Sequence, residues 1–145
     1  MTRSAEVEAL CRAEGFPVLR HAEPHRSDTV RLGLTALLAQ QPGLQGCVFL
    51  PGDQPCLTRQ TLEALAIGAA PDTIWRPAAP DGTPGSPVLF GRDYFAALLH
   101  LPEGCGGSAV LRAHPQAVCL LPALAAELQD IDTRSDLEAL QGDKG

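Results

Sequence analysis

Apolar residues follow two different spacings along this chain, and the two spacings predict helices and strands in alternation. Apolar positions three or four residues apart predict a helix over 4–14, a second from Ser27 to Gln41 and a third that begins after Thr58. Short unbroken apolar runs predict strands at Phe16–Leu19, Gly46–Leu50, Thr73–Trp75, Val88–Phe90 and Ala117–Leu121. The helical spacing returns in Tyr94–Leu101, before His114 and after Thr133.

This alternation predicts the α/β class, with helices packed on a mostly parallel sheet. The run Gly46–Leu50 has no polar alternation, which is typical of a strand covered on both faces. The chain has 145 residues, enough for one domain with a substantial core. We therefore expect a domain over 1–141 and a polar tail over 142–145 that holds Lys144, the single lysine.

Composition excludes several classes of function. A net charge of −6 argues against a nucleic-acid backbone or an anionic membrane as partner. The five cysteines are odd in number and none has CxxC spacing, so neither a disulfide framework nor a zinc site is indicated. The polar N-terminus and the absence of a long apolar run predict a cytoplasmic protein.

The clearest candidate for chemistry is Asp53, in the segment Cys47–Pro55. An apolar run ends there in a turn with one carboxylate, and ligands of open α/β sheets bind beyond the carboxyl ends of strands. A carboxylate in that place suits a hard cation such as Mg²⁺, which binds phosphate oxygens. The alternative is a plain polar turn closed by Pro55.

Three other loops carry candidate chemistry. Pro84–Pro87 contains Gly85, whose lack of a side chain permits close approach of the backbone to a ligand. Gly104–Ser108 places backbone amides before a helix, a weak phosphate signal. Asp130 and Asp132 alternate, so both point to one side if the segment is extended. The alternative is that Asp132 lies beside a helix cap and Asp130 is solvated.

In order along the chain, these segments resemble the MobA-like NTP transferase family, and especially its molybdenum-cofactor cytidylyltransferases. The segments that carry the resemblance are Ser27–Leu34, Leu50–Pro55 (LPGDQP), Gly85–Phe90 (GSPVLF) and Asp130–Leu137 (DIDTRSDL). Ser86 stands where the family has histidine, and Arg134–Ser135 stand where it has Pro-Glu.

The resemblance implies a three-layer α/β/α Rossmann-like nucleotidyltransferase that transfers CMP from CTP, or GMP from GTP, to a molybdopterin and releases pyrophosphate. It implies Asp53 as the main Mg²⁺ ligand and catalytic residue, with Asp130 or Asp132 as a second ligand. It also implies that Ser27 and Gly33 lie near the nucleotide base, and Gly85 and Ser86 near the pterin substrate.

The chain also departs from the family pattern. The family's first strand and its glycine-rich triphosphate loop have no counterpart here, and Gly104–Ala109 lacks the acid and the arginine of the matching family segment. A sheet without its first strand exposes unpaired backbone. Three explanations of these departures therefore follow: the chain is a fragment of a longer enzyme, it is a nucleotide- or pterin-binding module without catalysis, or it is an interaction domain whose exposed sheet is covered by a second copy or a partner chain.

Overall fold

The chain divides into two compact units in the computed structural model, which describes residues 1–142. Unit 1 contains Met1–Gln45 and Arg92–Gln116, and unit 2 contains Gly46–Gly91 and the chain from Ala117 onward. The expected tail lies outside the described residues except for its first residue, Gly142, which ends the last helix. None of the described helices is both long enough and apolar enough to cross a membrane.

Unit 1 is helical, and local capping explains where its first two helices begin. Its helices are α1 (Ala5–Ala13), α2 (Arg26–Gln40), α4 (Phe95–Leu99) and α5 (Ser108–Ala113). The Ser4 hydroxyl accepts a hydrogen bond from the Val7 amide at 3.3 Å, as expected for an N-cap. Asp28 accepts one from the His25 amide at 3.3 Å, which fixes the start of α2. Helices α2 and α4 contact each other, and Leu34 and Leu98 are fully buried.

The strand predicted over Phe16–Leu19 is wrong. The described structure has only an isolated parallel bridge between Thr2 and Arg20, in which the Thr2 amide donates to the Leu19 carbonyl at 3.1 Å. Pro17 lacks an N–H to donate, and a strand requires a continuous ladder with a neighbour. The apolar composition of Phe16–Leu19 was therefore not sufficient to predict a strand.

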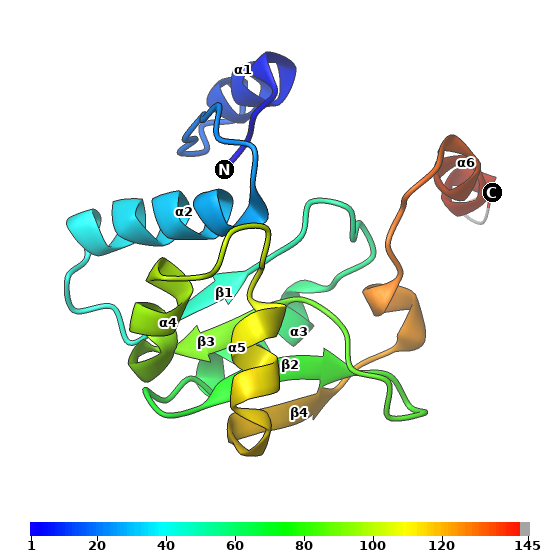
Figure 1. Ribbon diagram of the computed structural model, residues 1–145. Coiled ribbons are helices and arrows are strands. Elements are labelled where there is room, and N and C mark those ends of the chain that lie inside the picture. The colour runs from blue at the N-terminus through cyan, green and yellow to red at the C-terminus, as the bar shows by residue number, and fades with distance from the viewer. Residues whose placement is uncertain (143–145) are drawn as a thin grey trace. The chain divides into compact units, whose positions relative to one another are not determined.

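Unit 2 is built on a four-stranded sheet in the order β1-β3-β2-β4 (Figure 1). The strands are β1 (Gly46–Phe49), β2 (Ile74–Ala78), β3 (Val88–Gly91) and β4 (Val118–Pro122). β2 and β4 are parallel, whereas β3 is antiparallel to both β1 and β2. β1, β2 and β4 therefore run in one direction and β3 runs in the opposite direction.

The expectation of a mostly parallel sheet is correct for strand direction and wrong for strand pairing. Only the β2–β4 pairing is parallel, because the loop 79–87 between β2 and β3 is too short for the crossover that parallel neighbours require. β2 also continues through Pro77 and Ala78, beyond the predicted strand Thr73–Trp75. The Pro77 carbonyl accepts from the Gly85 amide at 2.8 Å, so this part of the strand is still paired.

Two helices complete unit 2. Helix α3 (Arg59–Ile67) begins at the N-cap Thr58 and packs against β2. It buries Thr61 and Leu65, while Ala66 is exposed. Helix α6 (Arg134–Gly142) starts after Thr133, as predicted, and a capping box forms there: Asp136 accepts a hydrogen bond from the Thr133 amide at 2.8 Å, and the Asp136 amide donates to the Thr133 hydroxyl at 3.2 Å.

The core of the sheet is centred on β3, which pairs with β1 on one side and with β2 on the other. All four of its residues are buried, and the Phe90 ring is only 1% exposed. Phe90 makes an edge contact with Phe49 of β1 at a centroid distance of 5.7 Å. This packing fixes β1, and with it the point at which the loop of Asp53 begins.

Candidate functional site

The loop after β1 and the segment before α6 are bonded to each other. The Ile131 amide donates to the Asp53 carbonyl at 2.8 Å. The Gln54 side-chain amide donates through Nε2 to Asp130 Oδ1 at 2.9 Å and to the Leu128 carbonyl at 3.3 Å. Asp53 and Asp130, which are far apart in sequence, therefore lie on two loops in direct contact.

The third acidic residue, Asp132, lies at the start of the last helix. The Asp132 and Thr133 amides both donate to Asp136, at 3.2 and 2.8 Å, so Asp132 lies at the entry to α6. Among residues 1–142, no three or more His, Cys, Asp or Glu side chains are grouped so that they could hold a metal ion. The expected set of Asp53, Asp130 and Asp132 is thus not a preformed three-carboxylate cluster.

Two carboxylates on contacting loops still fit a hard divalent cation. Mg²⁺ commonly binds one or two carboxylates and takes its other ligands from water and substrate phosphates. Asp53 and Asp130 are both exposed, so their carboxylates are accessible to a ligand. Asp130 Oδ1 is held by Gln54, and such a hydrogen bond restricts how the carboxylate can turn.

The loop with Gly85 joins the same part of unit 2. A Cβ at Gly85 would lie 3.0 Å from Cδ1 of Leu128, so a side chain here would press on the segment that carries Asp130. From the sequence we expected a ligand to lie close to the Gly85 backbone. In the described structure the Leu128 side chain lies there. Ser86 is partly buried and precedes a cis peptide bond to Pro87.

Arg76 of β2 was not identified from the sequence, although it borders this loop. Its Nε donates to the Gly85 carbonyl at 2.9 Å, and partial burial lowers the pKa of the guanidinium. None of the ion pairs found among residues 1–142 includes Arg76. The strand pattern gave no signal for it, because a single arginine in a strand is usually a solvent-facing residue.

Glu127 is a second residue that the sequence did not reveal. Its side chain is 6% exposed and accepts from the Thr58 and Thr61 hydroxyls at 2.6 and 2.7 Å. It also accepts from the backbone amides of Thr58 and Leu124 at 3.1 and 3.2 Å. Glu127 therefore ties the segment before Leu128 to the first turn of α3, and so supports the loop that carries Asp130.

Ser27 and Gly33 lie on α2 in unit 1. Ser27 is buried in the first turn of the helix, at 8% exposure. A Cβ at Gly33 would lie 3.1 Å from Cγ of Met1, so the glycine accommodates the N-terminal residue. Their expected place near a nucleotide base stays a prediction.

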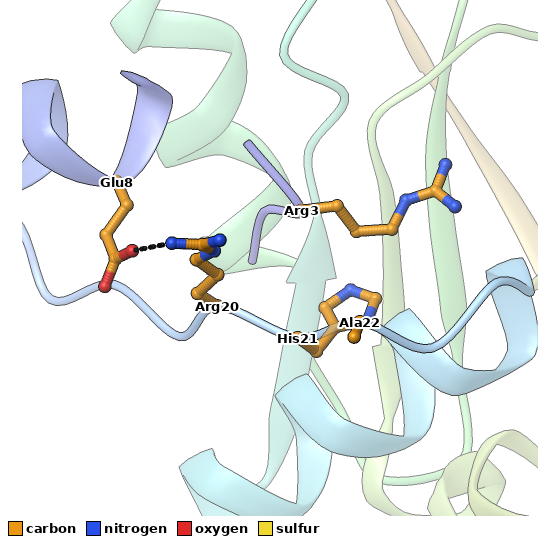
Figure 2. Close-up of a pocket in the computed structure, with 5 residues that line it drawn as sticks. All are labelled: Arg3, Glu8, Arg20, His21 and Ala22. Atoms are coloured by element: carbon orange, nitrogen blue, oxygen red, sulfur yellow. Dashed lines mark hydrogen bonds and ion pairs between the residues drawn. The ribbon is translucent and has the colours of Figure 1, made fainter. Parts of the chain in front are cut away.

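A separate hollow in unit 1 contains none of the expected site residues. Figure 2 shows its lining, which consists of Arg3, Glu8, Arg20, His21 and Ala22. The ion pair between Glu8 and Arg20, at 3.3 Å, offsets part of the positive charge that the arginines bring. His21 Nε2 is within hydrogen-bond distance of the Thr29 hydroxyl, at 3.1 Å. A lining in which Glu8 pairs with Arg20 does not by itself indicate an anion site.

Comparison with known proteins shows the family and the fold of this chain. Residues 1–118 match the family model of the MobA-like NTP transferase domain. Rv0371c from Mycobacterium tuberculosis has 26% sequence identity and a TM-score of 0.75, over 95% of this chain and 72% of that protein. A structure of Rv0371c in complex with manganese gives 27% identity and a TM-score of 0.70, over 94% and 72%.

An Rv0371c homologue from Mycobacterium sp. strain JC1 gives 25% identity and a TM-score of 0.66, over 93% and 70%. No curated protein matches the chain. The family match covers most of the sequence, and the solved structures share the α/β fold over nearly all of it. The chain therefore belongs to the MobA-like NTP transferase family, which makes it a nucleotidyltransferase-family protein.

Proposed function

We propose that this protein transfers a nucleoside monophosphate, CMP from CTP or GMP from GTP, to the terminal phosphate of a molybdopterin. The observation that carries the proposal is the contact between the two acidic loops of unit 2. Asp53 and Asp130 are placed on that contact by the 2.8 Å and 2.9 Å hydrogen bonds, in a member of a family of NTP transferases.

In the proposed reaction an oxygen of the acceptor phosphate attacks the α-phosphorus of the nucleotide. The new phosphoanhydride bond forms as the bond between the α-phosphorus and its bridging oxygen breaks, and pyrophosphate leaves with that electron pair. A divalent cation, Mg²⁺ or the Mn²⁺ seen with Rv0371c, would reduce the charge on the phosphates. Asp53 and Asp130 would hold it, and the protein's contribution is positioning and electrostatics.

Other residues would bind the two substrates. Ser27 and Gly33 are proposed to lie near the nucleotide base, and Gly85 and Ser86 near the acceptor. Arg76, which is bonded to the Gly85 carbonyl, supplies a positive charge beside the acceptor loop. Asp130 is proposed as the second cation ligand in preference to Asp132, because Gln54, the neighbour of Asp53, is bonded to the Asp130 carboxylate.

Titration calorimetry with CTP and Mg²⁺ tests this proposal, with Asp53→Ala as the variant and the exposed Asp93→Ala as a matched control. We expect saturable binding in the wild type and in Asp93→Ala, and loss of binding in Asp53→Ala. Pyrophosphate release in the presence of molybdopterin is the second expected result. Equal binding by the wild type and Asp53→Ala would contradict the assignment of Asp53.

An interaction domain is the second candidate, and exposed apolar side chains favour it. Leu120 on the outer strand β4 is 50% exposed, and Leu124, just beyond that strand, is 67% exposed. This candidate predicts a stable dimer or complex without nucleotide binding, measured by sedimentation. Nucleotide binding without pyrophosphate release would instead indicate a binding module that lacks catalysis.

A further inference from the structure

Gln54 is the least exposed residue of the segment that carries Asp53. It is 7% exposed, whereas its neighbours Asp53 and Pro55 are exposed. Burying a primary amide is unfavourable unless its polar atoms find partners. Its Nε2 has two partners, Asp130 Oδ1 and the Leu128 carbonyl, but its Oε1 has none among the described residues.

The chemistry of the partners fixes the orientation of this amide. Both groups facing Nε2 are oxygen acceptors, so the reversed amide would place an oxygen against two oxygens. Both amide hydrogens are therefore committed to the segment that carries Asp130. An apolar side chain of similar size would fill the same space without leaving a buried oxygen unpaired, so packing alone does not explain the glutamine.

The bond from Gln54 leaves Asp130 with one oxygen held and the other, Oδ2, without a partner in the described part of the chain. The 2.8 Å bond between the Ile131 amide and the Asp53 carbonyl holds the same two loops together through the backbone. A carboxylate restrained at one oxygen presents the other in a fixed direction. Groups that restrain a ligand in this way commonly change metal affinity by about 10- to 100-fold.

We infer that Gln54 is a positioning residue, which orients the Asp130 carboxylate for a divalent cation beside Asp53 without binding the cation itself. The inference rests on the proposed function, because it assigns Asp130 a part in holding that cation. It adds a residue that touches neither substrate in the proposed reaction. It also explains why a buried amide follows directly after the exposed Asp53.

The first test is Mn²⁺ affinity, measured by calorimetry on the whole chain. We compare the wild type with Gln54→Met, which keeps the length of the side chain but removes the donor, and with Gln60→Met on the exposed surface of α3 as the control. Gln54→Met should weaken Mn²⁺ binding about 10- to 100-fold, and Gln60→Met should leave it unchanged. In an Asp130→Asn background Gln54→Met should cause no further loss, because Gln54 acts through Asp130.

The second test needs no metal and uses Asp130→Ala, a substitution at an exposed position that remains informative if Gln54→Met does not fold. Exchange of the Gln54 side-chain amide protons with water, followed by NMR, should accelerate about tenfold when Asp130 is removed. Unchanged amide exchange, or unchanged Mn²⁺ affinity in Gln54→Met, overturns the inference while the proposed function stands. If Asp130→Ala accelerates exchange of the Gln54 amide protons but the wild type binds no Mn²⁺, with or without CTP, the proposed metal site is overturned, and the inference with it.

Discussion

The hydrogen bonds to the buried carboxylate of Glu127 predict how much this side chain contributes to the free energy of unfolding. It is almost fully buried and accepts four hydrogen bonds, from two hydroxyls and two backbone amides. A hydrogen bond to a charged group contributes about 1.5–3 kcal/mol, against about 0.5–1.5 kcal/mol for a neutral one. Glu127→Gln keeps the shape but turns an NH₂ group toward a donor, so we expect a loss of about 2–4 kcal/mol in the free energy of unfolding.

The effect should depend on pH in one direction. Burial raises the pKa of Glu127, but the hydrogen bonds from Thr58, Thr61 and Leu124 outweigh it and bring the pKa below the usual 4.5. A carboxyl with a lowered pKa in the folded state stabilises that state above its unfolded pKa, and this contribution is lost as pH falls through the folded pKa. The difference between wild type and Glu127→Gln should therefore be full at pH 7 and shrink below the usual pKa.

Urea unfolding followed by circular dichroism measures this difference at both ends of the pH range. Glu63→Gln is the matched control, because Glu63 lies exposed on α3 in an ion pair with Arg59, and such pairs contribute about 0–1 kcal/mol. A Glu127→Gln variant as stable as Glu63→Gln at pH 7 would refute the reasoning. So would a stability loss that is the same at pH 7 and at pH 3.

Two further predictions concern packing. Gly91→Ala should destabilise the protein by about 3 kcal/mol in urea unfolding, since a Cβ there would collide with the Ala70 and Pro71 carbonyl oxygens. Gly43→Ala, with open space around it, is the control, and equal stability of the two variants would contradict the packing of β3. Burial raises the pKa of the Cys47 thiol to about 11, so Cys47 should react with iodoacetamide at pH 8 more slowly than the partly exposed Cys56. Peptide mapping by mass spectrometry measures both rates, and equal labelling in the folded protein would show that Cys47 is accessible.

Local chemistry explains which elements the sequence predicted well. Ser4, Thr58 and Thr133 each cap the helix expected after them, since an N-cap requires only a side chain and the next few backbone amides. The buried strand Gly46–Phe49 was likewise evident as an unbroken apolar run. Phe16–Leu19 had a similar composition but no strand to pair with, and a ladder is not a local property.

In the candidate site, too, some features are encoded locally and others depend on tertiary packing. The sequence was sufficient to predict that Asp53 lies in a turn after a strand and that Asp130 and Asp132 precede a helix. Three features depend on tertiary packing: Asp130 is bonded to Gln54, Asp132 lies at the cap of α6, and Glu127 supports the segment that carries Asp130. Caps and apolar runs are encoded within a few neighbouring residues. A hydrogen bond such as that between Gln54 and Asp130 joins segments brought together by the packing of the sheet, and no local pattern encodes it.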